Sequence, residues 1–240
     1  MCDVCGCGDE KVVSVEVHER MLAGNDRTAQ HNREHFHENG LTAINLMGSP
    51  GAGKTLVLEA TAHALGRDAK LGVLAGDLAT DNDAARIRAA GIVAESITTG
   101  TACHLDADMV HRGLHHLPWK TLDYLFIENV GNLVCPAVYD LGQDANVVAL
   151  SVTEGEDKPL KYPTMFRKAD LVLLTKIDLL PALDIDLPAI ERNLRQVMLR
   201  PAMLLVSAKT GQGIDRWIAW LRGVGHLRAP ACATGVGMGL

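Results

Sequence analysis

From Leu41 onward, short apolar runs recur along the chain, and each is followed by a turn signal and a helix-like stretch. The runs are continuous rather than alternating, which is typical of strands that helices cover on both faces. They predict strands at 43–47, 71–75, 92–97, 124–128, 147–152, 171–175 and 203–207. The stretches between them predict helices at 55–65, 83–90, 105–115, 162–168, 185–198 and 214–221. This alternation indicates an α/β fold with a doubly wound, mostly parallel sheet.

The two ends of the chain differ from this central part. Residues 1–40 carry a cysteine cluster and then a polar, histidine-bearing stretch, in which 15–22 fits a short amphipathic helix and 25–39 a second helix. Residues 223–240 are rich in glycine and alanine, which is typical of a frayed tail. We therefore expect an N-terminal segment with a helical lead-in over 1–40, one main domain over 41–222 and a flexible tail over 223–240.

Composition narrows the class of protein. The chain has 240 residues, of which 23 are basic and 29 acidic, and the net charge of −6 argues against a broad basic surface for nucleic acid. No apolar run approaches the roughly 18 residues of a membrane-spanning helix, and the first residues show no secretory signal. We therefore expect a cytoplasmic protein without nucleic-acid or membrane partners, in which cysteines stay reduced. Its 6 cysteines are then candidate metal ligands or catalytic groups rather than disulfides.

The strongest motif is G-S-P-G-A-G-K-T at residues 48–55, which fits the phosphate-loop pattern G-x-x-x-x-G-K-S/T in full. It follows a predicted strand and opens a predicted helix, as the motif requires. Lys54 is expected to reach the β- and γ-phosphates, and the Thr55 hydroxyl to ligate Mg²⁺. Backbone N–H groups and the helix N-terminus are expected to cradle the phosphates. The residues of this cradle are Gly48, Ser49, Gly51, Ala52 and Gly53.

Two acidic residues are placed to complete the magnesium and water chemistry. Asp77 follows the second predicted strand and Glu128 ends the fourth. In an open parallel sheet ligands bind beyond the carboxyl ends of the strands, so either acid is expected to hold Mg²⁺ directly or through water. Together with Lys54 they are the predicted catalytic residues. Asp83 is interpreted as a helix N-cap, and Gly131 as the hinge of a loop that senses the γ-phosphate.

Two later loops indicate which base is bound. The stretch T-K-I-D at 175–178 resembles the guanine-reading N-K-x-D element of GTPases, with Thr175 in place of Asn. Asp178 can accept hydrogen bonds from guanine N1–H and the 2-amino group, and the stem of Lys176 can lie over the ring. The next predicted strand ends in a stretch that resembles a loop donating N–H to guanine O6: Ser207, Ala208 and Lys209. The pair of loops predicts GTP and GDP as ligands.

Cysteines form two candidate metal sites. Cys2, Cys5 and Cys7 place three thiolates within a few residues, and such ligands favour zinc, copper(I) or nickel. A second set lies in the main domain, where Cys103 and His104 open a predicted helix and Cys135 lies in the loop expected to respond to the nucleotide. A metal ligand in that loop would let the nucleotide change metal affinity.

Alternatives remain open for this second set. Cys103 and Cys135 can also be buried apolar cysteines. Asp108 and His111 share a helical face with His104, so they are further candidate ligands or part of a solvated helix face.

Several sequence blocks together resemble one family. They read N-L-M-G-S-P-G-A-G-K-T, G-D-L-A-T-D-N-D-A, T-G-x-x-C-H-L-D-A, E-N-V-G-N-L-V-C-P and E-G-E-D-K-P-L-K-Y-P-x-M-F, and they cover about residues 45–213. They resemble HypB, the nickel-insertion GTPases of nickel–iron hydrogenase maturation. The N-terminal C-x-x-C-G-C resembles the high-affinity nickel motif of some members. Long histidine-rich tracts of the kind that store nickel in some members are absent from the sequence.

The resemblance implies a G domain of the SIMIBI class of P-loop NTPases, which includes signal-recognition and partition proteins. It implies slow GTP hydrolysis coupled to nickel delivery, a nucleotide-dependent homodimer, and two partners: a nickel chaperone and the hydrogenase large-subunit precursor. It assigns a tight nickel site to the N-terminal cysteines, and a nickel or zinc site near the dimer interface to Cys103, His104 and Cys135. Lys158 is then a candidate to contact nucleotide bound to the partner subunit.

Three other functions remain as alternatives. The first is a urease-type nickel GTPase, which the N-V-G-N-L-V-C-P loop and the N-terminal thiols disfavour. The second is a zinc-stabilised, nucleotide-sensing binding module without turnover. The third is an ATP-dependent cluster or partition protein, which competition between ATP and GTP would distinguish.

Overall fold

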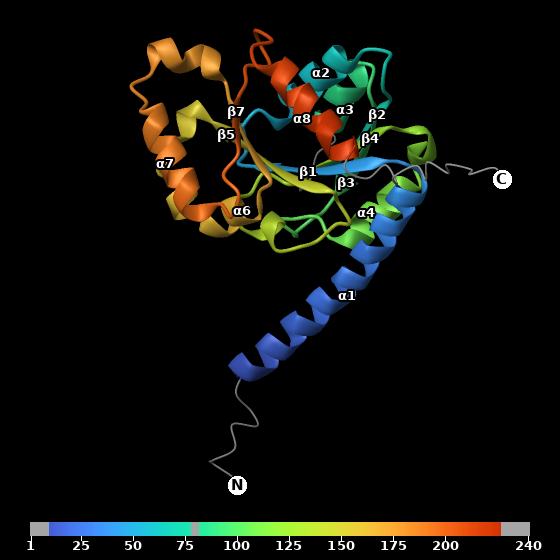
Figure 1. The fold of residues 1–240 in the computed structure, drawn as a ribbon. Helices are drawn as coiled ribbons and strands as arrows, with labels where there is room; N and C mark the ends of the chain where they lie inside the picture. Colours follow the sequence, from blue (N-terminus) through green and yellow to red (C-terminus); the bar gives the residue numbers. More distant parts are fainter. Residues whose placement is uncertain (1–9, 78–81, 227–240) are drawn as a thin grey trace, which may run out of the picture.

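Seven parallel strands form one sheet (Figure 1) in the computed structural model, which describes residues 10–77 and 82–226. Their order across the sheet is β3-β2-β4-β1-β5-β6-β7, and every neighbouring pair is parallel. The strands are β1 (Thr42–Gly48), β2 (Leu71–Asp77), β3 (Val93–Thr98), β4 (Tyr124–Glu128), β5 (Ala145–Ser151), β6 (Leu171–Thr175) and β7 (Met203–Leu205). Because all carboxyl ends lie along one edge, the loops with the predicted motifs meet there.

Helices cover both faces of the sheet, which confirms the doubly wound fold. The α-helices are α1 (Glu10–Glu38), α2 (Lys54–Leu65), α3 (Asn82–Ala89), α4 (Ala107–Leu114), α5 (Lys158–Lys161), α6 (Pro163–Lys168), α7 (Leu187–Val197) and α8 (Ile214–His226). Short 3-10 helices are η1 (Trp119–Thr121), η2 (Cys135–Ala137), η3 (Val152–Glu154) and η4 (Ile177–Ala182). Helices α2, α3 and α8 lie on one face, while α1, α4, α6 and α7 lie on the other (Figure 1).

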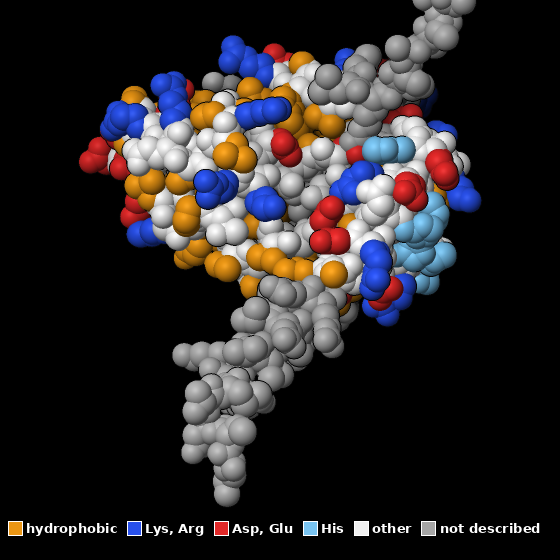
Figure 2. Space-filling view, turned by 60° about the horizontal axis from the view of Figure 1, so that its bottom comes forward, with side chains coloured by type: hydrophobic (Ala, Val, Ile, Leu, Met, Phe, Trp, Pro, Cys, Tyr) orange, Lys and Arg blue, Asp and Glu red, His pale blue; other side chains and the backbone are white. Residues whose placement is uncertain are grey.

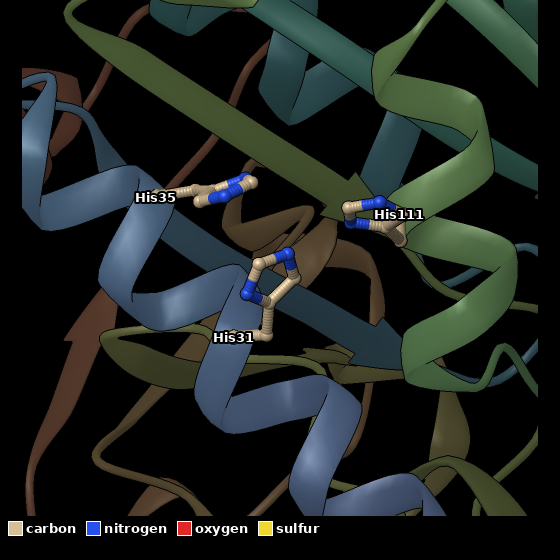
Figure 3. A group of neighbouring side chains, drawn as sticks. All are labelled: His31, His35 and His111. Atoms are coloured by element: carbon tan, nitrogen blue, oxygen red, sulfur yellow. The ribbon is translucent and has the colours of Figure 1, made fainter.

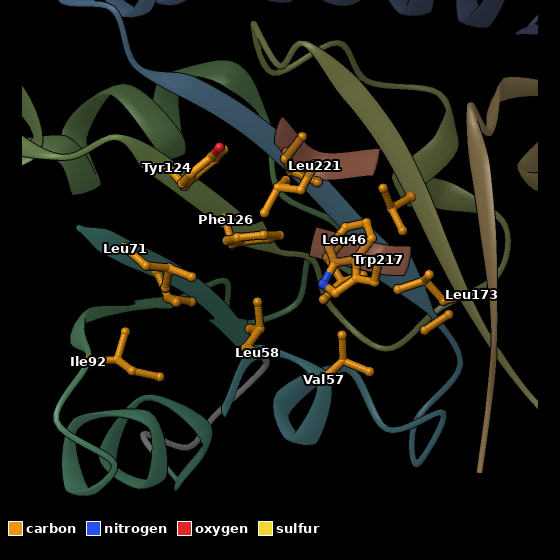
Figure 4. Packing of buried hydrophobic residues seen from close by; sticks show 14 of the residues in the cluster. Leu46, Val57, Leu58, Leu71, Ile92, Tyr124, Phe126, Leu173, Trp217 and Leu221 are labelled. Atoms are coloured by element: carbon orange, nitrogen blue, oxygen red, sulfur yellow. The ribbon is translucent and has the colours of Figure 1, made fainter. Parts of the chain in front are cut away.

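Strand β4 shows why the apolar runs are continuous. Tyr124 and Phe126 pack into the cluster beneath α2 and α8, where Trp217 is fully buried (Figure 4). Leu125 and Ile127 point the other way, into the cluster formed with α1 and α4. Successive residues of a strand face opposite sides, so a strand covered on both faces needs an apolar side chain at nearly every position. Each residue buried in this way stabilises the fold by about 1.5–3 kcal/mol.

The N-terminal helices are a correction to the sequence prediction. The separate helices expected at 15–22 and 25–39 are one continuous helix, α1, whose N-terminal end projects from the α/β body (Figure 1). Tertiary contacts hold the chain helical across the expected break. The Asn25 side chain donates to the Asp140 carbonyl oxygen at 2.8 Å and accepts from the Ala107 N–H at 2.9 Å. These two bonds fix α1 to the loop before β5 and to the start of α4.

Element ends differ from prediction where loops carry the motifs. Strand β7 ends at Leu205 rather than at residue 207, because Val206 and Ser207 already belong to the loop beyond it. Helix α4 begins at Ala107, where the Asp106 side chain caps it by accepting from the Met109 N–H at 2.7 Å. Helix α8 continues to His226. Among the described helices, none has the length and apolar character needed to cross a bilayer.

Candidate functional site: a nucleotide loop beside a cysteine–histidine cluster

The phosphate loop connects the central strand β1 to helix α2, as predicted. Gly48 has φ 149°, and a Cβ there would lie 2.5 Å from the Ala149 carbonyl oxygen of β5, so only glycine fits at the start of the loop. Gly53 has φ 91° at the N-cap of α2, where the helix N-terminus opens toward the loop. The loop therefore presents backbone donors at the carboxyl edge of the sheet, which suits a phosphate group.

Lys54 and Thr55 are buried at the start of α2 and face acidic groups. Lys54 Nζ donates to the carbonyl oxygens of Gly48 at 3.4 Å and Ser49 at 3.3 Å, so its ammonium group lies against the loop. Burial lowers the pKa of Lys54, although the nearby Glu128 carboxyl opposes this effect. The ammonium group of Lys54 is thus buried beside the phosphate loop, where a bound phosphate would compensate for its lost hydration.

Glu128 lies next to Thr55, as the prediction of a shared magnesium site requires. The Thr55 hydroxyl donates to Glu128 Oε1 at 2.9 Å. Burial raises the pKa of Glu128 to about 7, although Lys54 and the Thr55 hydrogen bond lower it in part. Glu128 Oε2 is buried without a hydrogen-bond partner. An unpartnered carboxylate oxygen beside a hydroxyl matches the hard oxygen ligands of Mg²⁺, so these residues fit the ion.

Two further acids differ in how the structure bears on their predicted roles. Asp83, which we interpreted as an N-cap, lies inside the first turn of α3, and its Oδ1 is 3.2 Å from the Thr55 hydroxyl. Asp83 is therefore a third oxygen ligand candidate that sequence reasoning missed, because a helix start explained the residue without a ligand. Asp77 ends β2, where its carbonyl oxygen accepts from the Thr99 N–H at 2.9 Å.

The two predicted base-reading loops meet at the ends of β6 and β7. The Ser207 hydroxyl donates to Asp178 Oδ1 at 2.7 Å, which fixes the orientation of that carboxylate. Lys176 has φ 59° and its Nζ donates to the Gly51 carbonyl oxygen at 2.6 Å, so its stem crosses the phosphate loop. Thr175, the departure from Asn, donates to the Ala52 carbonyl oxygen at 2.6 Å. The threonine hydroxyl thus ties this loop to the phosphate loop.

The loop after β5 contacts the phosphate loop through a residue that the sequence analysis did not single out. The Ser49 hydroxyl donates to Glu154, whose other carboxylate oxygen accepts from the Ser151 N–H at 2.9 Å in a capping box. Glu154 follows β5, the strand beside β1, and this position is the feature from which its contact with the phosphate loop could have been predicted. Lys158, the candidate for contacting a partner's nucleotide, begins α5 and lies with its Nζ 5.3 Å from the Tyr162 ring centroid.

Cys103, His104 and Cys135 come together as predicted, with one ligand atom of each within 4.8 Å of the others. The Cys103 and Cys135 thiols form no disulfide. The pKa of Cys135 is raised mainly by its hydrogen bond with Cys103 and to a smaller extent by burial. Burial lowers the pKa of His104, whose ring stacks on Tyr139 at 3.9 Å between centroids. His104 Nδ1 is buried without a partner. Two thiols and an unpartnered imidazole nitrogen match the ligands of nickel or zinc.

The segment after β4 joins this cluster to the phosphate loop. Asn132 forms an antiparallel bridge with Gly48, and its side chain donates to the Cys103 carbonyl oxygen at 3.3 Å. Gly131 lies so close to the phosphate loop that a Cβ would be 2.9 Å from Pro50. Cys135 follows directly, in η2. One short segment therefore contacts the phosphate loop, contacts Cys103 and carries Cys135.

The remaining predicted ligands lie elsewhere. Asp108 pairs with Arg112 at 3.0 Å on the exposed side of α4, and His111 Nδ1 lies 2.9 Å from Asn32 Oδ1 of α1. Neither belongs to the Cys103 cluster, so the shared helical face did not bring these candidates together. The N-terminal cysteines Cys2, Cys5 and Cys7 lie outside the described residues.

Comparison with known proteins identifies related nucleotide-binding proteins. Residues 42–204 match the family described as CobW/HypB/UreG, nucleotide-binding domain. Hydrogenase maturation factor HypB of Azotobacter chroococcum mcd 1 is 51% identical over 207 residues, which cover 86% of this chain and 68% of that protein. The crystal structure of HypB from Helicobacter pylori in complex with nickel is 38% identical and covers 87% of this chain and 98% of that one, with a TM-score of 0.82.

A more distant structure shares the fold alone. The signal recognition particle 54 kDa protein of Aeropyrum pernix K1 is 14% identical, with a TM-score of 0.53 over 78% of this chain and 47% of that one. The phosphate loop, the parallel sheet and this likeness place the fold in the SIMIBI class of P-loop NTPases. With the family match and the high identities, the chain belongs to the HypB family of hydrogenase maturation factors.

Proposed function

We propose that the chain is a GTP-hydrolysing nickel metallochaperone, which delivers nickel during hydrogenase maturation and couples its GTP state to dimerisation and metal transfer. One observation carries the proposal. Asn132 contacts the phosphate loop at Gly48 and the cysteine cluster at Cys103, so this one residue would link the nucleotide site to the metal site. The HypB–nickel complex from Helicobacter pylori supports nickel as the cargo.

Nucleotide chemistry rests on the carboxyl edge of the sheet. Lys54 would bind the terminal phosphates, and Asp178, held by Ser207, would accept from the guanine base. Thr55 and Glu128 would hold Mg²⁺, with Asp77 as a further candidate ligand and Asp83 adding its carboxylate. When bound, Mg²⁺ would neutralise phosphate charge. The remaining phosphate contacts would come from the backbone of 48–53, and those to the base from Lys176, Ala208 and Lys209.

Nickel is the cargo in this proposal, and the two cysteine sites act in sequence. Cys2, Cys5 and Cys7 would capture nickel tightly, and Cys103, His104 and Cys135 would hold nickel or zinc where the nucleotide controls affinity. Movement of the phosphate loop on GTP binding would shift Asn132 and therefore Cys103 relative to Cys135. Thiolates and imidazole bind only when unprotonated, so this site would release protons as it loads.

The dimer would form over the cysteine cluster. Val134 and Val138 flank Cys135 and are 52% and 41% exposed, although both are large apolar residues. A second copy would cover them and would bring Lys158 toward the partner's nucleotide. The nickel chaperone of the hydrogenase pathway would supply the metal and the large-subunit precursor would receive it, in the cytoplasm.

Nickel titration with defined nucleotides tests the coupling. The protein would carry Cys2→Ser, Cys5→Ser and Cys7→Ser so that the core site is measured, with GDP, a GTP analogue or no nucleotide. We expect nickel affinity to change with nucleotide, Asn132→Ala to abolish that response, and Cys135→Ser to lose nickel. If the Cys135→Ser protein kept both its nickel affinity and the response to GTP, the coupling would be wrong.

Turnover separates the enzyme from a passive sensor. Saturating GTP with Mg²⁺ should be hydrolysed slowly, and Lys54→Ala should abolish hydrolysis because no other side chain offers the phosphates a charge from within the loop. Competition by ATP at equal concentration should be weak, since adenine lacks the donor pair that Asp178 accepts. Strong ATP competition, or turnover that survives Lys54→Ala, would contradict the assignment.

A further inference from the structure

A second group of possible metal ligands lies between α1 and α4, away from the cysteine cluster. His31 and His35 lie one turn apart on α1, and His111 faces them from α4 (Figure 3). One nitrogen of each ring lies within 4.8 Å of the others. Their ring centroids are 4.1, 5.3 and 5.9 Å apart. Three imidazoles from two helices thus converge on one point. The two helices are far apart in the sequence, since 79 positions separate His111 from Asn32, the neighbour of His31.

A buried hydrogen-bond network sets the chemistry of His111. Asn32 is fully buried, and its amide group donates to the carbonyl oxygens of Ala107 at 2.9 Å and Leu141 at 3.3 Å. Its Oδ1 therefore faces His111 Nδ1, at 2.9 Å, and can only accept. His111 Nδ1 must then carry the proton, which leaves Nε2 with a free lone pair. Metal-binding histidines are commonly oriented by such a bond from the other nitrogen.

The side chains of His31 and His35 differ in how far the surrounding residues restrain them. The His35 ring stacks on Trp119 at 5.9 Å between centroids with 9° between the planes, so its orientation is supported by packing. His31 is exposed. Metal–nitrogen bonds of about 2.1 Å place imidazole nitrogens about 3.4 Å apart in a tetrahedral site. The present nitrogen spacing is within 4.8 Å, so rotations of the side chains, with the exposed His31 the least restrained, would bring the three nitrogens to the tetrahedral distance.

We propose that His31, His35 and His111 bind a borderline divalent cation, zinc or nickel, and that this ion clamps α1 onto α4. Three imidazoles suit these ions, and they leave a fourth position for water, so the ion can exchange. Histidine side chains gather at one edge of the molecular surface in Figure 2, which is open to solvent. This site is additional to the cysteine sites of the proposed function and does not depend on them.

Metal titration of a cysteine-free full-length chain tests the site. Cys2, Cys5, Cys7, Cys103, Cys135 and Cys232 would be changed to Ser, and zinc alone or nickel alone would be added. We expect one equivalent to bind. His35→Ala and His111→Ala should each weaken metal binding by more than roughly 10–100-fold, which is the typical loss when a residue that only hydrogen-bonds to a metal ligand is removed. His63→Ala is the matched control, because His63 is exposed on α2 and lies outside the cluster.

Two further readouts keep the test decisive. Cobalt(II) bound to this cysteine-free protein should show ligand-field bands, and His111→Ala should lose them. In the protein with all its cysteines, zinc should raise the midpoint of thermal unfolding more than it does in His111→Ala, since the ion joins two helices. Equal titrations for His111→Ala and His63→Ala would overturn the proposal. Loss of nucleotide-dependent nickel affinity with an intact histidine site would instead count against the proposed function alone.

Discussion

At the scale of single residues, burial decides how the acids of the nucleotide site behave. Glu128 ends a strand that is buried on both faces, and the residue is 3% exposed. Burial disfavours the charged form, and this cause outweighs the attraction of Lys54 and the bond from Thr55. Glu128 is thus near half protonation at neutral pH in the nucleotide-free protein. A bound cation would favour the ionised form.

The first prediction concerns the stability of the nucleotide-free protein. Folding raises the pKa of Glu128 from 4.5 to about 7, so the folded state holds a proton that the unfolded state releases between these values. The stabilisation is complete below pH 4.5 and is lost as pH rises through 7, by about 3 kcal/mol. Denaturant unfolding of the wild type and Glu128→Gln should show this loss only in the wild type. Parallel curves would contradict it.

Sequence reasoning at this scale found residues whose motif fixes their role. Lys54 and Thr55 follow from the phosphate-loop pattern, and Asp178 follows from two loops that point to the same base. It misread Asp83, which contacts Thr55 from the first turn of α3, and it passed over Glu154. Asp83 lies in α3 and Glu154 in η3, and the fold brings them to Thr55 and Ser49. No local spacing in the sequence relates them to the phosphate loop.

At the scale of elements, the segment between β4 and η2 would carry the proposed coupling between nucleotide and metal. Asn129 follows β4 and is buried, and its side chain donates to Asn45 of β1 at 3.1 Å while accepting from the Leu105 N–H at 3.1 Å. Gly131 then passes against Pro50, and Asn132 reaches Cys103. The segment thus contacts β1, the phosphate loop and the cysteine cluster within a few residues. It can transmit movement because each contact is direct.

The second prediction removes the close approach at Gly131. In Gly131→Ala the new Cβ would meet Pro50 at 2.9 to 3.2 Å, so the segment and the phosphate loop must separate. We expect weaker GTP binding and a smaller effect of GTP on nickel affinity, both measured by titration. Gly24→Ala is the control, because a Cβ there meets nothing within 4 Å in α1. It should leave both affinities unchanged and stabilise the protein by about 0.5–1 kcal/mol. Unchanged coupling in Gly131→Ala would argue against transmission through this segment.

At the scale of the whole molecule, exposed apolar residues support the proposed dimer surface. Val134 and Val138 lie next to Cys135, on the same edge of the molecule as the phosphate loop. Burying them in a dimer would place two cysteine clusters near each other and would enclose the nucleotides. GTP would then favour the dimer by ordering the segment that carries these valines.

The third prediction tests that surface. Val134→Glu should leave GTP affinity unchanged but prevent dimerisation with a GTP analogue, because a charge would be buried in the interface. Sedimentation equilibrium of both states measures the effect. Val93→Glu is the matched control, since Val93 is 42% exposed on the edge strand β3. A GTP-dependent dimer that persists in Val134→Glu would place the interface elsewhere.

The sequence by itself determined the α/β class, the approximate strand positions and the phosphate loop, and it predicted which residues read the base. These follow from local periodicity and from short motifs whose residues are neighbours in the chain. Tertiary structure alone decided that α1 is continuous, since Asn25 bonds to loops more than 80 positions away. It also decided that His111 belongs with α1 rather than with Cys103, and that Asp83 reaches Thr55. Contacts between distant elements depend on how the helices pack on the sheet, and local spacing does not encode that packing.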